Sequence, residues 1–276
     1  MSQSFIKITS SSNPAIKTLK GLHRKKVRAE TGLFMAEGGR LVHQGLDCGW
    51  KPGYLAITEE GLSRPHLNNL AARAASMGAR VMEVPEALLS QISGKDNPGA
   101  VVAAFQQQNR DLSSLTPAIT SLWIGLYQIR DPGNLGTILR TADCIGAAGV
   151  ILIGTCCDPY SVEAVRASMG AVFDIPFATA DFQTFDSWRQ STGATLVAAS
   201  VNGTKRHDAL AFGGRTVILI GNEQAGLPEE IERVCDHLAL IPMRAGADSL
   251  NLAQATAIMA YEAWRAHGYP GAAEPA

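Results

Sequence analysis

The side chains best suited to chemistry lie in three loops that each follow an apolar strand. An amide and a guanidinium stand six residues apart at Asn134 and Arg140, and Glu223 lies in a loop bounded by glycines. Ser249 and Asn251 follow the third strand. Open α/β sheets bind ligands at the carboxyl ends of their strands, and glycine-rich loops there often hold phosphates or nucleotides. The three loops therefore predict a single ligand site.

The sequence argues against two other kinds of site, a dinucleotide site and a metal site. The glycines of DPGNLGTILR are three apart and those of GNEQAG are five apart, so the G-x-G-x-x-G fingerprint of dinucleotide enzymes is absent. This argues against an NAD-dependent oxidoreductase, the first rival function. Asp131 and Glu163 belong to no cluster with metal-ligand spacing, and the six histidines are scattered. We therefore expect no metal.

The second half of the chain alternates apolar runs with helical patterns. Continuous apolar runs are typical of parallel strands covered on both faces, and the alternation with helices indicates an α/β fold. The pattern predicts a six-stranded, doubly wound sheet. Its expected strands are residues 122–127, 149–154, 171–178, 195–200, 216–221 and 238–243.

An alanine-rich helix is expected after the third loop. Ser249 or Asp248 is a candidate for its N-cap, because a short side-chain oxygen can accept a free first-turn N–H. Small side chains at several positions allow other backbone to approach closely. The helical period predicts one buried face made of Leu250, Ala253, Ala257, Tyr261 and Trp264.

The first 40 residues carry eight basic and two acidic side chains, although the whole chain has a net charge of −1. Phosphate binding depends on clustered Lys and Arg and not on overall charge. The segment therefore predicts contact with a polyanion such as RNA, and a solvated basic helix without a partner is the alternative. The candidate RNA-binding residues are Lys17, Lys20, Arg24, Lys25, Lys26, Arg28 and Arg40.

The first hundred residues also alternate helices and strands. We expect a basic amphipathic helix over residues 13–29, followed by a small α/β domain with a largely parallel sheet. The polar stretch 106–118 lacks apolar periodicity and is the best linker candidate. The expected strands are residues 33–36, 54–58, 80–84 and 100–105.

Composition limits the remaining possibilities. The amino terminus has no apolar stretch of a secretory signal, and no run approaches the roughly 18 apolar residues of a membrane span. Five cysteines include no C-x-x-C pair, so reduced thiols in a cytoplasmic protein are expected.

The three loops together resemble the motifs of the SpoU/TrmH family of RNA 2′-O-ribose methyltransferases. These motifs are N-x-G-x-x-x-R at 134–140, G-x-E-x-x-G-L at 221–227 and I-P-M…S-L-N at 241–251. The basic helix followed by LFMAEGGRLVHQGL is similar to the family's N-terminal substrate-binding domain. The resemblance implies an RNA substrate-binding domain over 1–107, with a ribosomal-protein-like α/β fold. It also implies a methyltransferase domain over 118–276, with a trefoil knot and a parallel sheet.

The resemblance assigns roles to individual residues. It implies that S-adenosylmethionine contacts Gly221, Ile241 and Leu250, largely through backbone groups, and that two copies form a homodimer. Asn134, Arg140, Glu223, Ser249 and Asn251 would be the catalytic residues. An arginine does not ordinarily act as a base, so Arg140 either clamps an RNA phosphate or lowers the pKa of the ribose hydroxyl while another group takes the proton.

The expected activity is S-adenosylmethionine-dependent 2′-O-methylation of RNA, with ribosomal RNA favoured over transfer RNA. A non-catalytic RNA-binding or ribosome-assembly protein with the same fold is the second rival. The segment SVEAVRASMGAVFDIPF also follows a family-like pattern. Arg166 or Ser168 within it contacts RNA or a dimer partner, or else has a structural role.

Overall fold

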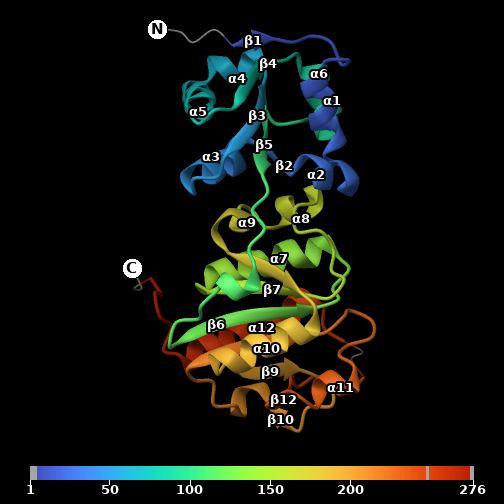
Figure 1. The fold of residues 1–276 in the computed structure, drawn as a ribbon, viewed down its shortest axis with the longest axis vertical. Helices are drawn as coiled ribbons and strands as arrows, with labels where there is room; N and C mark the ends of the chain where they lie inside the picture. Colours follow the sequence, from blue (N-terminus) through green and yellow to red (C-terminus); the bar gives the residue numbers. More distant parts are fainter. Residues whose placement is uncertain (1–4, 247–248, 274–276) are drawn as a thin grey trace. The chain divides into compact units, whose positions relative to one another are not determined.

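The computed structural model describes residues 5–246 and 249–273, and the chain forms two compact units (Figure 1). The first unit contains the residues up to Gln108 and takes in a later segment, Asp158–Phe173. The second unit contains Asn109–Cys157 and the residues from Asp174 onward. The family resemblance did not indicate the excursion of 158–173. The domain limits 1–107 and 118–276 stay a prediction.

The first unit is built on a five-stranded sheet with the order β1-β4-β3-β5-β2. Strand β5 pairs antiparallel with both β2 and β3, whereas β3–β4 and β1–β4 are parallel. The expectation of a largely parallel sheet is therefore wrong, because β5 returns against its neighbours. The strands are β1 (Ile6–Lys7), β2 (Leu33–Glu37), β3 (Pro52–Ile57), β4 (Arg80–Glu83) and β5 (Val101–Gln106).

Helices cover this sheet. The single basic helix expected over 13–29 is instead two helices, because the chain turns at Leu22–Arg24 and Arg24 has extended backbone angles. Asn13 caps the first helix by accepting from the Ala15 N–H at 2.9 Å. The helices are α1 (Pro14–Gly21), α2 (Lys25–Thr31), α3 (Gly39–Asp47), α4 (Glu59–Ser63), α5 (Pro65–Ser76), α6 (Glu86–Ser93) and α8 (Val162–Ala167).

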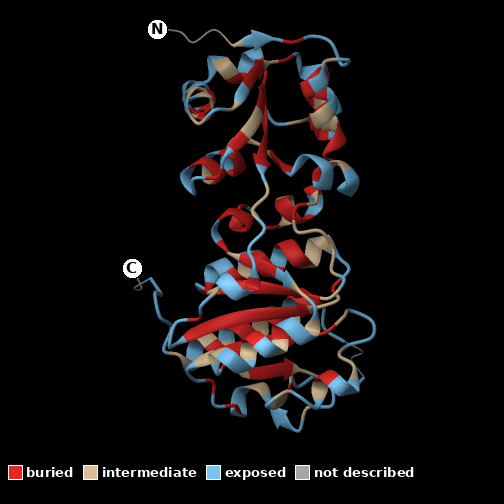
Figure 2. Cartoon of the chain, viewed as in Figure 1, coloured by how far each residue is buried: buried red, intermediate tan, exposed pale blue. Residues whose placement is uncertain are grey.

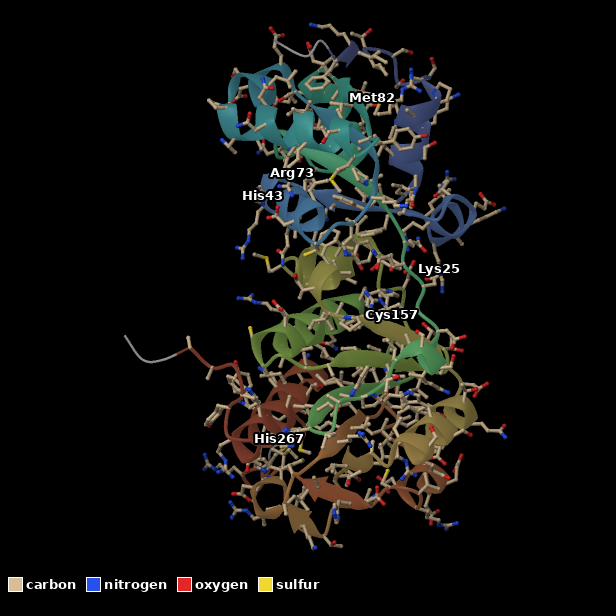
Figure 3. The ribbon with its side chains drawn as sticks, turned by 60° about the vertical axis from the view of Figure 1, so that its left-hand side comes forward. Lys25, His43, Arg73, Met82, Cys157 and His267 are labelled. Carbon is tan, nitrogen blue, oxygen red and sulfur yellow. The ribbon has the colours of Figure 1, made fainter. Side chains whose placement is uncertain are left out.

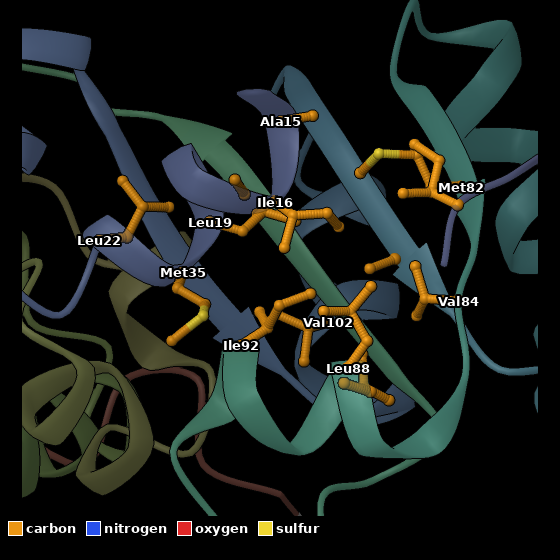
Figure 4. Packing of buried hydrophobic residues seen from close by; sticks show 14 of the residues in the cluster. Ala15, Ile16, Leu19, Leu22, Met35, Met82, Val84, Leu88, Ile92 and Val102 are labelled. Carbon is orange, nitrogen blue, oxygen red and sulfur yellow. The ribbon is translucent and has the colours of Figure 1, made fainter. Parts of the chain in front are cut away.

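One hydrophobic core of the first unit lies between the sheet and helices α1 and α6. Ile16 and Leu19 of α1 and Leu22 at its C-cap recur at helical spacing and pack with Leu88 and Ile92 of α6 (Figure 4). All five are buried. The two lysines of α1 are not among the buried residues, since Lys17 is exposed and Lys20 is half-buried.

The segment 158–173 is attached to the first unit by charged and polar contacts. The guanidinium of Arg28 donates to Asp158 Oδ2 from Nε and Nη2, at 2.9 and 2.6 Å. Arg166 donates to the two oxygens of Glu37 at 3.0 and 2.6 Å, and Ser168 is buried and bonded to its own helix turn. For Arg166 and Ser168, the structure supports the structural alternative.

The second unit contains a seven-stranded sheet of parallel pairs, in the order β10-β12-β9-β11-β6-β7-β8. Its central strands are buried along their length (Figure 2), which confirms the predicted α/β fold with a parallel sheet. The trefoil threading stays a prediction. The strands are β6 (Ser121–Tyr127), β7 (Gly149–Ile153), β8 (Phe177–Ala180), β9 (Thr195–Ala199), β10 (Lys205–Arg206), β11 (Arg215–Ile220) and β12 (His237–Leu240).

One predicted strand of this unit is wrong. Residues 171–178 begin as a helical turn, α9, and only the end of the range enters β8. The short strand β10 was also not anticipated. The helices that lie wholly in this unit are η1 (Leu112–Ser114), α7 (Pro132–Cys144), α10 (Phe182–Thr192), η2 (His207–Ala209), α11 (Glu229–Glu232) and α12 (Leu252–Ala266), whereas α9 (Ala171–Asp174) belongs to the first unit as far as Phe173.

The last helix begins later than predicted and presents a different face. Its N-cap is Asn251, whose side chain accepts from the Ala253 N–H at 2.9 Å. Ser249 is therefore not the cap, and Asp248 lies outside the described residues. The predicted buried face was wrong for Leu250 and Tyr261, which are 37% and 45% exposed. The buried residues are Leu252, Ala253, Thr256, Met259, Ala260 and Ala263.

Two further observations concern the described ranges, 5–246 and 249–273. None of their helices combines the length and the apolar character needed to cross a lipid bilayer. No three or more His, Cys, Asp or Glu side chains within these ranges are grouped in a way that could hold a metal ion.

The Arg28–Asp158 pair generates a prediction about stability. Asp158→Ala leaves a guanidinium that is only 4% exposed without its counter-charge. We expect the free energy of unfolding to fall by about 3 kcal/mol, measured by urea denaturation. Glu30→Ala, which removes a carboxylate from the exposed Lys26–Glu30 pair, is the control and should cost less than about 1 kcal/mol. Equal losses for the two variants would contradict this account.

Candidate active site

A cavity of about 890 Å³ lies in the second unit, where β6, β9, β11 and β12 end. Its volume falls within the range of small-molecule sites, and its lining mixes apolar and polar groups as such sites do. It brings together most of the residues predicted from the three loops. These are Asn134, Gly221, Glu223, Ile241, Ser249, Leu250 and Asn251.

The loop after β11 is organised by Asn222, which the sequence analysis did not single out. Its Oδ1 accepts from the N–H groups of Gln224 and Ala225, at 3.0 and 3.1 Å. Its Nδ2 donates to the Gln128 carbonyl at 2.7 Å. Gln128 has a positive φ of 50°, which is uncommon for a residue other than glycine. One amide thus joins the loops after β6 and β11.

Glu223 strengthens the same connection. Its carboxylate accepts from the backbone N–H groups of Arg130 and Asp131, each at 3.2 Å. Asp131 in turn caps α7 by accepting from the Asn134 N–H at 2.7 Å. The carboxylate of Glu223 therefore fixes the start of α7, where Asn134 enters the cavity.

The third loop is joined to the first by two asparagines. Asn251 Nδ2 donates to Asn134 Oδ1 at 3.0 Å, although 117 residues separate them. Since Asn251 Oδ1 already caps α12, its amide ties the starts of α7 and α12 together. The motif residues Asn134, Glu223 and Asn251 consequently form one hydrogen-bonded frame.

Gly221 is required by the protein's own backbone. A Cβ at this position would lie 2.4 Å from the Gly226 carbonyl carbon and 2.7 Å from the Leu227 nitrogen. The family resemblance implies that this glycine contacts the cofactor. The structure gives a reason within the loop itself, because the loop folds back over Gly221.

The adjacent thiols are poor nucleophiles. Burial raises the pKa of the Cys157 thiol to about 12, and it also raises the pKa of Cys156. The thiolate is the reactive form of cysteine. Both groups therefore stay protonated at neutral pH, and covalent catalysis through either of them is not supported.

Arg140 is not part of the cavity lining. It lies six residues beyond Asn134 on α7 and its side chain is exposed. That spacing places it about a third of a turn around the helix axis from Asn134. The structure therefore separates Arg140 from the other motif residues within one chain.

The candidate RNA-binding residues of the first unit differ in their exposure and in their partners. Lys17, Arg24, Lys25 and Arg40 are exposed, and Lys25 is labelled in Figure 3. Arg28 differs, because it is buried and bound by Asp158. Lys20 donates to Gln91 at 3.0 Å, and Lys26 lies 3.9 Å from Glu30.

Two family models match successive parts of this chain. Residues 121–261 match the SpoU rRNA Methylase family, and residues 13–103 match the MRM3-like substrate binding domain. A Synechocystis protein described as an uncharacterised tRNA/rRNA methyltransferase is 30% identical, over 94% of this chain and 93% of its own.

Two other proteins have more specific descriptions. The 23S rRNA (uridine(2479)-2′-O)-methyltransferase of Streptomyces viridochromogenes is 29% identical, over 90% of this chain and 87% of its own. The crystal structure of an AdoMet-bound rRNA methyltransferase from Sinorhizobium meliloti is 44% identical, with a TM-score of 0.89. It covers 94% of this chain and 97% of its own.

The packing around Gly221 generates a prediction. Gly221→Ala forces the loop 222–227 away from β11, and we expect a loss of about 2 kcal/mol in unfolding free energy. Faster hydrogen exchange of the 222–227 amides should accompany it. Gly213→Ala is the matched control, since a Cβ there meets nothing within 4 Å. If the two variants unfold alike, the close approach does not constrain this loop.

Proposed function

Because this chain belongs to the SpoU rRNA Methylase family, we propose that it transfers a methyl group from S-adenosylmethionine to a ribose 2′-hydroxyl of ribosomal RNA. The observation that carries the proposal is the frame of Asn134, Glu223 and Asn251 beside a cavity of suitable size. The relatives described as 23S rRNA 2′-O-methyltransferases support ribosomal RNA as the substrate.

The residues of the cavity fit S-adenosylmethionine. Gly221, Ile241 and Leu250 line it, together with the apolar side chains of Ile220 and Leu240. Such walls suit an adenosine, and polar groups at the loop ends suit its hydroxyl, amino and carboxyl groups. When bound, the cofactor supplies a methyl group on a positively charged sulfur.

The chain's polar residues orient the reactants. Glu223 uses its carboxylate to hold the backbone of Arg130 and Asp131, so we assign it a positioning role. Asn251 holds Asn134 in the same way. Ser249 also lines the cavity and is proposed to orient the ribose or the cofactor. A ribose hydroxyl held in line with the methyl group reacts faster, because the entropic cost of orienting the two reactants has been met on binding.

Arg140 is proposed to clamp a phosphate of the RNA. Its guanidinium is exposed and lies outside the cavity lining, which favours the clamp over a direct effect on the pKa of the hydroxyl. A guanidinium presents a planar fork of donors that matches phosphate oxygens. The clamp would bring the 2′-hydroxyl of the bound nucleotide to the methyl group.

The first test concerns Arg140. Arg140→Ala should retain cofactor binding, measured by calorimetry, and should lower methyl transfer from labelled S-adenosylmethionine by about a hundredfold or more. Arg140→Lys should rescue little, because an ammonium lacks the planar fork. Arg110→Ala removes another exposed arginine and serves as control. Near-normal turnover by Arg140→Ala would exclude Arg140 from the mechanism.

The first unit is proposed to capture the RNA. Lys17, Arg24, Lys25 and Arg40 are exposed cations on it, and its residues match a substrate-binding domain. Lys20 and Lys26 can join them, because both keep accessible ammonium groups. Arg28 is left out of the proposed surface, since Asp158 occupies its guanidinium.

The second test reverses charges on this surface. Lys17→Glu with Lys25→Glu should weaken RNA binding and lower the slope of log affinity against log salt by about one per lost phosphate contact. Cofactor affinity should not change. Lys51→Glu with Lys205→Glu makes the same charge change at other exposed lysines. Equal losses for both pairs would show that overall charge, and not this surface, attracts the RNA.

A homodimer is also proposed, in a cytoplasmic setting. Tyr261 is 45% exposed on α12 and forms an edge-to-face pair with Trp264, 5.6 Å between ring centroids. Aromatic residues are enriched in protein–protein interfaces relative to the rest of the surface. We expect sedimentation at twice the 29.2 kDa chain mass and a shift toward monomer in Tyr261→Glu. A monomeric wild-type protein that is fully active at nanomolar concentration would refute the dimer.

A direct measurement identifies the substrate. The 2′-O-methyl positions of RNA should be mapped in cells with and without this protein. Loss of one ribosomal RNA methyl group is the expected result. Loss of a transfer RNA methyl group would change the substrate, and an unchanged map would favour a non-catalytic role.

A further inference from the structure

A second polar group lines the cavity away from the motif residues. Glu232 of α11 accepts from Ser200 Oγ at 2.5 Å and from Asn202 Nδ2 at 3.1 Å. The Asn202 N–H also donates to Ser200 Oγ, at 3.0 Å. All three residues line the cavity, and none belongs to the three motifs.

This group is held by backbone contacts on its far side. The Ser200 N–H donates to the Ala239 carbonyl at 3.0 Å. A Cβ at Gly203 would lie 2.6 Å from the Leu240 nitrogen, so the turn after β9 is packed directly on β12. The backbone that carries Ser200 and Asn202 is thus packed against the sheet.

The position of the group relative to the motif residues follows from the sheet order. Asn134 follows β6 and Ser200 follows β9, with β11 between them. Adjacent strands are about 4.8 Å apart, so β6 and β9, whose ends lead to the two polar regions, are separated by roughly 10 Å. Ile220 and Gly221 at the end of β11 line the space between. This separation accommodates part of a nucleoside between the two polar regions.

The carboxylate of Glu232 is suited to a ligand that donates hydrogen bonds. An ionised carboxylate only accepts hydrogen bonds and has about four sites for them. Ser200 and Asn202 use two of these sites, which leaves further acceptor capacity on a carboxylate whose residue lines the cavity. The two neighbouring hydroxyls of a ribose provide two donors side by side, and carboxylates bind ribose hydroxyls in other nucleotide sites.

We propose that Glu232, held by Ser200 and Asn202, binds the ribose hydroxyls of S-adenosylmethionine. This inference rests on the proposed function and adds a recognition residue to its cofactor site. Glu232 then selects ribonucleosides over deoxynucleosides and holds the sugar at a fixed distance from the motif residues.

Binding of two small nucleosides tests the inference. 5′-Methylthioadenosine carries both hydroxyls, its 2′,3′-dideoxy analogue carries neither, and both lack the amino-acid end of the cofactor. Calorimetry on the wild-type protein should show at least a tenfold preference for the diol. Glu232→Ala should abolish most of that preference, whereas Glu230→Ala, at an exposed position of the same helix, should retain it.

Several outcomes overturn the inference. If the wild-type protein binds both nucleosides equally well, the inference is wrong, even if the variants fail to fold. If Glu232→Ala loses affinity equally for both nucleosides, the inference is also wrong, since Glu232 would then only support the cavity wall. Binding of S-adenosylhomocysteine to the wild-type protein separates the two hypotheses. If it binds without a diol preference, only the role of Glu232 fails; if it does not bind, the proposed function fails as well.

Discussion

The carboxylate of Glu223 holds the site together. It accepts backbone N–H groups from the loop after β6, while its neighbour Asn222 binds the Gln128 carbonyl of that loop. Two strands that are adjacent in the sheet are thereby joined at their carboxyl ends. The start of α7, the position of Asn134 and its bond to Asn251 all follow from this link. Hydrogen bonds to a charged group are stronger than neutral ones, which suits a carboxylate to this task.

The sequence predicted the loops well because their residue types are unusual. Asn134, Glu223 and Asn251 lie in glycine-bounded or strand-ending loops, and the structure joins them in one frame. Parallel strands bring their ends to one edge of the sheet, so residues far apart in sequence meet there. For Gly221 the proposed contact with the cofactor stays a prediction, and the structure adds another reason for a glycine, since the chain's own loop already excludes a Cβ.

Other features could not be predicted from the sequence pattern. Alanines occur around most of α12, so the helical period did not fix which face is buried, and Tyr261 proved exposed. Arg28 looked like any other cation of a basic segment, because its partner Asp158 is 130 residues away. Glu232 lies among other glutamates of α11, and only the contacts with Ser200 and Asn202 distinguish it. Long-range pairing cannot be inferred from spacing alone.

The excursion of residues 158–173 has a consequence for synthesis on the ribosome. The first unit lacks Asp158, Arg166 and the Phe173 carbonyl, which accepts from Trp50 Nε1 at 2.9 Å, until the chain has been translated well past its first hundred residues. These contacts therefore form only after a segment encoded inside the second unit has been translated, although domains usually fold in order of synthesis. The peptide chain also passes between the units at three places, near residues 108, 157 and 173. A single protease cut in the stretch 109–118 would leave the two units covalently connected.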